Sequence, residues 1–296
     1  MDLGNKINKI LNYYAMNHEN KKIAFIGGGM MAEAMIRGII LHGHNPAKIY
    51  VSDPSEDRRN ILSILNNQLN IENNNNKIAL TCDVLFMAVK PQIFLDVANN
   101  ISQVTQKQDP VIVSIAAGIS LETLTACFGE QSKICRVMPN QPCLVGKGVS
   151  ALIAKNLADD DKRLVTYLFN SVGKSIWLDN EDWMHAVTAI SGSGPAYFYH
   201  IMELLTDSAI SAGIPENIAK ELVMQTAIGA SELAHNSPDD VKTLRQKVSS
   251  PGGTTEAAFD SLDGNDIRSI WKQAIDAAIK RSIDLGARTT DDESKN

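Results

Sequence analysis

The stretch Lys22-Ile-Ala-Phe-Ile-Gly-Gly-Gly-Met-Met-Ala-Glu-Ala-Met-Ile-Arg37 decides how the first half of the chain folds. Residues 23–26 form a short apolar run of the kind that a buried strand needs, and an apolar helical pattern follows the glycines. Between them, three small residues fit the G-x-G-x-x-G/A spacing: Gly27, Gly29 and Ala32. Strand, glycine turn and helix in this order predict a dinucleotide-binding unit, and a plain glycine-rich turn in an α/β protein is the alternative.

Each small residue in this turn has a physical role to fill. Gly27 allows a tight turn, and Gly29 lets a pyrophosphate approach the backbone, because any side chain there would fill its space. Ala32 lets the helix pack closely on the strand. We expect the free N–H groups and the positive dipole end of the helix to receive the phosphates.

A second strand is expected at residues 48–52, and Asp53 follows it. In this architecture that position meets the adenine ribose, where an acid favours a 2′-hydroxyl and repels a 2′-phosphate. Nearby side chains could nevertheless hold a 2′-phosphate: Ser52, Ser55, Arg58 and Arg59. The other interpretation, which stays open, is that Asp53 caps a helix that begins at Pro54.

Further apolar runs are too short for helices and predict buried strands at residues 83–91, 111–118, 134–139, 149–153 and 175–178. A helix is expected at residues 159–169, and Ser120 is expected to cap another. The asparagine-rich residues 66–77 read as a solvated turn region. Strands that alternate with helices predict a Rossmann-type, mostly parallel sheet that is covered on both faces.

From about residue 179 the pattern is helical only, with helices expected at residues 181–190, 195–212, 215–234, 239–248, 254–262 and 266–285. Gly213 and Gly286 are expected to cap helix C-termini, and Ser237-Pro238 to open a helix. The fold class is therefore α/β, with a dinucleotide-binding domain at residues 21–178 and an all-helical dimerisation and substrate domain at residues 179–296. Residues 1–20 are expected to be a poorly ordered tail, in which Met16 is an alternative start to Met1, and the polar residues after 286 to fray.

Composition excludes several classes of function. The net charge of −6 argues against nucleic acid and anionic membranes as partners. No apolar run approaches the roughly 18 residues of a membrane span, and the polar N-terminus lacks the core of a signal peptide, so a cytoplasmic protein is expected. Four cysteines without a C-x-x-C pair read as small buried thiols, and no metal site is expected: Cys82, Cys127, Cys135 and Cys143.

Two Gly-Pro-rich segments interrupt the helical half, at residues 191–197 and 248–256. Ser250 before Pro251 reads as a helix cap with a good first helical residue. Gly252 and Gly253 leave bare backbone N–H groups, which bind small anions such as a carboxylate. Hydroxyl groups follow at Thr254 and Thr255. The two segments together favour a substrate site over glycines that merely allow close helix packing.

At these motifs the chain resembles the pyrroline-5-carboxylate reductases, over residues 22 to about 286. The motifs that carry the resemblance are IGGGMMA (26–32), AVKP (88–91), SIAAG (114–118), RVMPN (136–140), AISGSGPAY (189–197) and VSSPGGTT (248–255). The first is shared by many dehydrogenases, whereas the last two are specific to that family.

The resemblance implies reduction of 1-pyrroline-5-carboxylate to L-proline with NADPH, or also NADH. It also implies a homodimer formed through the helical domain, with a decamer as the higher assembly. The implied cofactor contacts, beside Ser52 and Asp53, are Gly27, Gly28, Gly29, Met30, Met31, Asn75, Ala88, Val89, Lys90 and Ala116. The implied substrate loop is Ser250, Pro251, Gly252, Gly253 and Thr254, followed by Thr255. Asp53 departs from what a strict NADPH user should carry.

For the reaction, we assign the substrate carboxylate to the backbone N–H groups around residues 250–254. Thr255 is the candidate catalytic residue, as a hydrogen-bond partner near the ring nitrogen. An imine can arrive already protonated, so no enzymic acid is required. The nearby ionisable residues read as surface or packing groups: Glu256, His185 and His200.

Two rival functions remain in view. A β-hydroxyacid dehydrogenase shares the glycine turn but needs a catalytic lysine early in its helical domain, and no lysine or arginine occurs between Lys174 and Lys220. A dinucleotide-binding regulator without turnover would be expected to lose the Ser-Pro-Gly-Gly-Thr loop, which this chain keeps.

Overall fold

The computed structural model describes residues 18–291. The described residues form two compact units, one of residues 18–192 with 279–291 and one of residues 193–278. Most of the expected N-terminal tail, with both candidate start residues, lies outside the described residues, as do the last five residues. Within the described part of the chain, no helix is both long and apolar enough to cross a bilayer.

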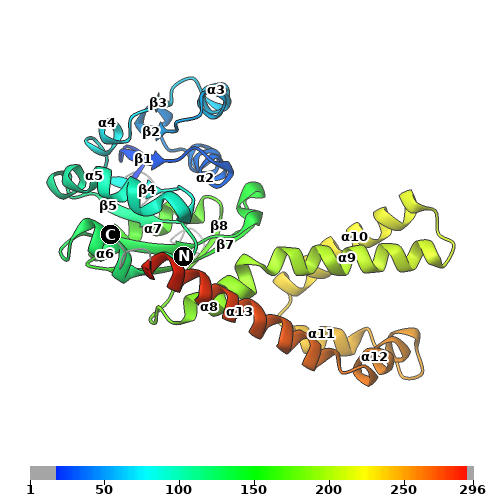
Figure 1. Cartoon of the computed structure of the whole chain (residues 1–296). Helices are drawn as coiled ribbons and strands as arrows, with labels where there is room; N and C mark the ends of the chain where they lie inside the picture. The colour runs from blue at the N-terminus through cyan, green and yellow to red at the C-terminus, as the bar shows by residue number, and fades with distance from the viewer. Residues whose placement is uncertain (1–17, 292–296) are drawn as a thin grey trace, which may run out of the picture. The chain divides into compact units, whose positions relative to one another are not determined.

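The first unit is built on one eight-stranded sheet (Figure 1). Its strands are β1 (Ile23–Ile26), β2 (Ile49–Ser52), β3 (Asn70–Glu72), β4 (Val84–Met87), β5 (Val111–Ser114), β6 (Ile134–Met138), β7 (Gly148–Lys155) and β8 (Gly173–Trp177). They lie in the order β3-β2-β1-β4-β5-β6-β7-β8, and only the β6–β7 pair is antiparallel. The predicted Rossmann-type, mostly parallel sheet is confirmed.

Helices cover both faces of this sheet. Successive strand residues point to opposite sides, so a continuous apolar strand gives the sheet two apolar faces that must be covered. The helices are α2 (Met30–Leu41), α3 (Glu56–Leu65), α4 (Asn75–Ala79), α5 (Phe94–Gln108), α6 (Leu121–Phe128) and α7 (Asp159–Asn170). Phe25 joins one core cluster with α2 and α7, where it stacks on Phe86 with ring centroids 4.5 Å apart. Ala24 and Ile26 join the other cluster, with α4, α5 and α6. The short apolar strands are buried because both faces are covered.

The expectation of a solvated turn region at residues 66–77 holds at residues 66–68 and is wrong for residues 70–72 and 75–77. This segment forms β3, which pairs with β2 at the edge of the sheet, and then the short helix α4. The Asn74 side chain caps α4 by accepting the N–H of Lys77 at 3.2 Å. Asparagine therefore acts here as a capping residue, and the backbone pairing with β2 supplies a strand that the polar side chains do not suggest.

The rest of the described chain after β8 is helical. The helices are α8 (Trp183–Val187), α9 (Gly194–Ser211), α10 (Glu216–Asn236), α11 (Val241–Lys247), α12 (Thr254–Gly264) and α13 (Ile267–Asp291), with a π-helical turn at Thr188–Gly192 after α8. Buried Met184 of α8 packs with Ala151 and Ile153 of β7. The compact units therefore divide after residue 192, later than the expected domain boundary near 179, which stays a prediction.

Three helix-end expectations have different outcomes. Gly213 ends α9 with a φ of +93°, as expected. Gly286 does not cap a helix, because α13 continues to Asp291; a side chain there would lie 3.6 Å from the carbonyl oxygen of Gly118. The helix expected to open at Ser237-Pro238 begins at Val241 instead, where the Asp240 side chain caps it.

Candidate active site

The predicted cofactor residues of the first unit gather at the carboxyl ends of the parallel strands. They follow the carboxyl ends of β1, β2, β4 and β5, which lie side by side in the sheet order. From β1 the chain runs outward to β2 and β3 on one side, and it then crosses back to β4 on the other side of β1. Dinucleotides bind at such a switch point in open α/β sheets.

The glycine turn after β1 is shaped for close approach. Gly27 has a φ of +96°, and a Cβ atom there would lie 2.5 Å from the carbonyl oxygen of Ala88, which follows β4. Gly29 has a φ of −65°, and a Cβ atom there would meet no described atom within 4 Å. The space beside Gly29 is therefore open, whereas Gly27 is required by the fold itself.

Gly29 is also the N-cap residue of α2, and no side chain caps this helix end. The first helical residues are Met30 and Met31, so their backbone N–H groups lie where a helix N-terminus attracts phosphate. Open space in front of an uncapped helix N-terminus fits the pyrophosphate of a dinucleotide.

Two predicted residues from separate elements meet at the end of β2. The buried Ser52 hydroxyl donates a hydrogen bond to the side-chain oxygen of Asn75, the first residue of α4. The sequence alone offered no reason, apart from the family resemblance, to place Asn75 at this site. Backbone pairing of β2 with β3 brings it there.

Asp53 binds the glycine turn. Its carboxylate accepts the N–H of Gly28 at 2.8 Å and the N–H of Ser55 at 2.8 Å. Ser55 is the residue that caps α3, so the capping interpretation of Asp53 is wrong.

The remaining predicted cofactor residues follow β4 and β5. Ala88 N–H donates to the carbonyl of Ile26 at 2.8 Å, which joins the end of β4 to the end of β1. Val89 and Lys90 continue from this junction, and Ala116, nearly buried, follows β5. Of these residues, Ala88 and Val89 lie directly beside Gly27, where an added Cβ atom would meet them.

The predicted substrate loop lies in the second unit, before α12. The carbonyl of Ser250 accepts the N–H of Gly253 at 2.9 Å, and Gly252 has a φ of +71°. Residues 250–253 therefore form a turn, and Gly253 is the N-cap of α12. The expectation that Ser250 caps this helix, with Pro251 as first helical residue, is wrong.

One contact of this loop was missed from the sequence. The N–H of Gly252 donates to the Glu256 carboxylate at 2.6 Å. Glu256 is the third residue of α12, and its carboxylate reaches back to the residue before the N-cap Gly253, one residue further than in a capping box. The N–H of Gly252 therefore binds a carboxylate, as we expected, but the carboxylate in this structure is the side chain of Glu256.

Two polar residues of the RVMPN motif also have contacts that were not foreseen. Asn140 accepts the N–H of Val149 at 2.9 Å and donates to the carbonyl of Ser191 in the π-helical turn at 3.1 Å. Arg136, nearly buried, pairs with Glu181 at 2.5 Å. The Arg136–Glu181 and Asn140–Ser191 contacts join the sheet to the segment around α8, the first from within β6 and the second from just after it.

The two histidines considered in the sequence analysis both have side-chain partners within the protein. His185 Nδ1 lies 3.0 Å from the hydroxyl of Ser282 in α13, and burial together with the charge of Arg136 lowers its pKa. His200 is exposed and pairs with Glu203 at 3.0 Å on α9. Both are packing or surface residues in this structure.

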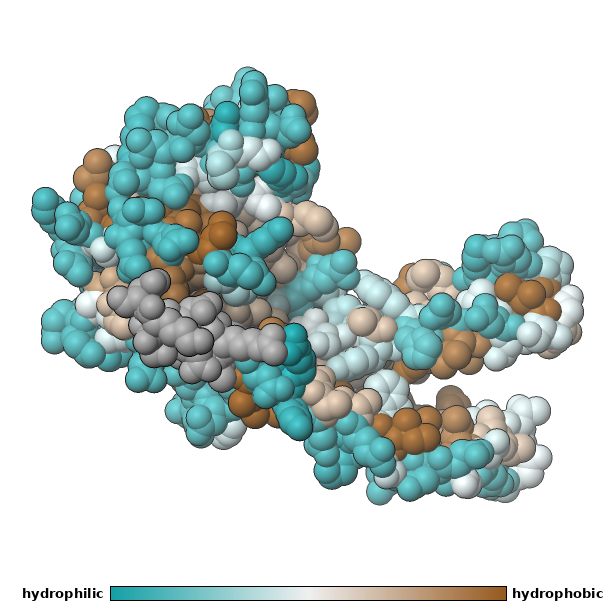
Figure 2. All heavy atoms as spheres, viewed as in Figure 1, coloured by the Kyte–Doolittle hydropathy of each residue, from teal (hydrophilic) through white to brown (hydrophobic). Residues whose placement is uncertain are grey.

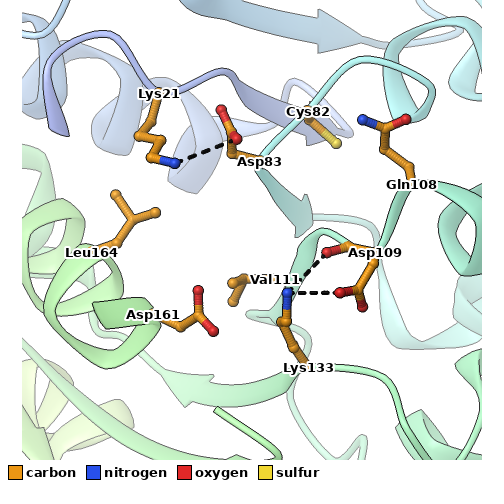
Figure 3. A pocket seen from close by; sticks show the side chains of 9 residues that line it. All are labelled: Lys21, Cys82, Asp83, Gln108, Asp109, Val111, Lys133, Asp161 and Leu164. Carbon is orange, nitrogen blue, oxygen red and sulfur yellow. Dashed lines mark hydrogen bonds and ion pairs between the residues drawn. The ribbon is translucent and has the colours of Figure 1, made fainter. Parts of the chain in front are cut away.

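A polar pocket lies at the opposite end of the strands, where β1, β4, β5 and β6 begin (Figure 3). Asp83 lies 3.6 Å from Lys21, and Asp109 lies 2.7 Å from Lys133. None of the predicted site residues lines this pocket, so it is separate from the dinucleotide edge. Nearby Cys82 is buried, which raises the pKa of its thiol to about 12 and makes it unreactive.

Comparison with known families gives two matches along the chain. The model for pyrroline-5-carboxylate reductase dimerisation matches residues 181–285. The model for coenzyme F420-dependent NADP oxidoreductases matches residues 22–118. The two matches fall on the helical part and on the glycine-turn part of the chain.

Whole-chain relatives agree with these matches. The pyrroline-5-carboxylate reductase of Haemophilus influenzae is 39% identical over 269 residues, which cover 90% of this chain and 98% of the relative. The solved reductase of Coxiella burnetii is 34% identical with a TM-score of 0.85, covering 90% of this chain and 98% of that one. The reductase of Plasmodium falciparum, solved with NADP bound, is 34% identical with a TM-score of 0.80, covering 90% and 99%. The chain therefore belongs to the pyrroline-5-carboxylate reductase family of NAD(P)-dependent oxidoreductases.

Proposed function

We propose that this chain reduces 1-pyrroline-5-carboxylate to L-proline with a hydride from NAD(P)H, the last step of proline biosynthesis. Family membership over 90% of the chain is the observation that carries this proposal. The geometry supports it in two places. The space beside Gly29 is open for a dinucleotide, and the N–H of Gly252 is directed at a carboxylate.

NADPH is the proposed cofactor, with NADH also accepted, and when bound it supplies the hydride. The residues proposed to hold it are Gly27, Gly28, Gly29, Met30, Met31, Ser52, Asp53, Asn75, Ala88, Val89, Lys90 and Ala116. The uncapped N-terminus of α2 would take the negative charge of the phosphates.

The substrate carboxylate is proposed to bind the backbone N–H groups of residues 250–254. Gly252 already donates to a carboxylate, so substrate binding would displace Glu256 from this amide. Among the described residues, the Thr255 hydroxyl makes no hydrogen bond, and it remains available for the ring nitrogen. Positioning and a polarising hydrogen bond would then carry catalysis, because the imine arrives protonated.

The direct test adds 1-pyrroline-5-carboxylate and NADPH to the purified chain and follows the absorbance of NADPH together with the appearance of proline. A parallel reaction offers a β-hydroxyacid with NADP⁺. Stoichiometric proline is the expected result. Turnover of a β-hydroxyacid instead would favour the dehydrogenase, and cofactor binding without turnover of either substrate would favour the regulator. Either result would overturn the proposal.

A homodimer through the helical domain, with a decamer as the possible higher assembly, is part of the proposal. Of the 18 residues of α9 only Gly194 is buried, and of the 21 residues of α10 only Ala219. Figure 2 shows apolar residues on the surface of these helices. The large exposed ones on α9 and α10 are Phe198, Tyr199, Ile201, Leu204, Leu205, Ile210, Ile218, Leu222, Met224, Ile228 and Leu233. A surface of this kind needs a partner.

The double substitution Leu204→Asp and Leu222→Asp is expected to weaken the dimer by at least about a hundredfold in Kd, because two charges would enter an apolar interface. Sedimentation velocity over a range of concentrations measures this, and the sedimenting mass separates dimer from decamer. Ile64→Asp on α3 is the control, since Ile64 is exposed on the first unit. A wild-type chain that is monomeric at micromolar concentration would contradict the proposed assembly.

We also propose that the dinucleotide-binding domain ends at residue 178 and that the dimerisation and substrate domain begins at residue 179. The proposed location of the protein is the cytoplasm. Cys82, Cys135 and Cys143 are free thiols, as expected in a reducing compartment.

A further inference from the structure

The backbone N–H and the backbone carbonyl of Gly28 both form hydrogen bonds with side chains from the segment that follows β2. Its N–H donates to Asp53 Oδ2 at 2.8 Å. Its carbonyl accepts from Arg58 Nε at 2.8 Å and from Arg58 Nη2 at 2.5 Å. Gly28 lies inside the dinucleotide turn, so the residues beside the expected adenine ribose are tied directly to that turn.

Arg58 has a second partner that keeps it in this position. Arg58 Nη2 donates to Glu33 Oε2 at 2.9 Å, and the two side chains are largely buried, with 25% and 19% of their surfaces exposed. Glu33 also pairs with Arg37 at 2.8 Å, and hydrogen bonds from Arg37 and Arg58 lower the pKa of its carboxyl group. Glu33 is therefore a stable anion that neutralises Arg58 locally.

The other nearby guanidinium is also directed at the backbone. Arg59 Nη1 donates to the carbonyls of Asp53 and Pro54, at 2.8 and 2.9 Å. The two arginines that could receive a 2′-phosphate thus bind main-chain oxygens, while the carboxylate of Asp53 remains partly exposed at the end of β2. A 2′-phosphate would bring up to about two negative charges toward this carboxylate, whereas a 2′-hydroxyl could donate a hydrogen bond to it.

We infer that the network of Asp53, Gly28, Arg58 and Glu33 determines the cofactor preference of this chain by weakening NADP(H) relative to NAD(H). Asp53 acts directly on the ribose substituent, and Glu33 acts as a positioning residue that holds Arg58 away from it. This inference rests on the proposed function, in that the dinucleotide binds at the glycine turn. This network would allow NADH to serve as a cofactor of this chain, although the matching family model and a solved relative name NADP.

The test is titration calorimetry of the purified full chain with NAD⁺ and with NADP⁺, without substrate. Asp53→Asn removes the charge but can still accept the N–H of Gly28. It is expected to raise the ratio of Kd for NAD⁺ to Kd for NADP⁺ by about tenfold or more. Glu33→Gln is expected to raise the ratio about threefold, because Arg58 is released. Asp57→Asn, an exposed acid in the first turn of α3, is the matched control and should leave the ratio within about twofold.

A ratio that Asp53→Asn leaves unchanged would overturn the inference, and so would an equal rise in Asp57→Asn, which would indicate net charge alone. An equal loss of affinity for NAD⁺ and NADP⁺ in Asp53→Asn would show that Asp53 only supports the conformation of the turn. That result would also overturn the inference. If Asp53→Asn does not fold, Asp53→Ser takes its place with the same expected rise. Because no substrate is present, a chain that shows the rise but makes no proline overturns the proposed function and leaves this inference standing.

Discussion

Replacing Gly29 by valine is expected to abolish measurable binding of NADPH while the chain stays folded. The Cβ position at Gly29 meets no described atom within 4 Å, and its φ of −65° suits any residue. A valine therefore fits the protein but fills the space through which a pyrophosphate approaches the N-terminus of α2. Fluorescence titration with NADPH measures the loss, which should exceed about a hundredfold in Kd.

The control for this variant is its stability. Valine is a poor N-cap residue, so a loss of up to about 2 kcal/mol in the free energy of unfolding is expected. Gly29→Ala, which adds only one methyl group, should fall between valine and the wild type in cofactor affinity. A folded Gly29→Val chain that binds NADPH normally would remove the turn from the cofactor site.

The substitution Thr255→Ala is expected to lower kcat/KM for 1-pyrroline-5-carboxylate about ten- to a hundredfold. Loss of one oriented hydrogen bond to the substrate costs about 1–3 kcal/mol, and each 1.4 kcal/mol is tenfold. If the bond forms mainly in the transition state, the loss appears in kcat; if it also holds the bound imine, KM rises as well. Steady-state kinetics with saturating NADPH separates the two.

Thr255→Ser is the matched variant, because it keeps the hydroxyl and removes only a methyl group. It should retain most of the activity that alanine loses. Thr255 is the second residue of α12 and is partly exposed, so neither change should alter folding. Unchanged kinetics in Thr255→Ala would exclude this hydroxyl from the mechanism.

The local elements of the first unit were predictable because their signals lie within a few residues of each other. Apolar runs of four or five residues gave the buried strands, and serine before a helical pattern gave the cap of α6 at Ser120. The glycine turn was predictable for the same reason, since its spacing and its flanking strand and helix are contiguous. The largest error falls where a distant partner decides the conformation. Residues 70–72 form a strand because they pair with β2.

At the candidate site, the amino-acid sequence was enough to name the residue types: small residues in the turn, an acid after β2, and bare amides before α12. It could not say which atoms those groups bind. Folding brings Asp53 onto the N–H of Gly28, and Gly286 against Gly118 inside a continuous helix. Patterns along the chain report hydrophobic periodicity and turn chemistry, whereas these contacts depend on strand order and helix packing, which arise only when residues far apart in the chain are assembled in three dimensions.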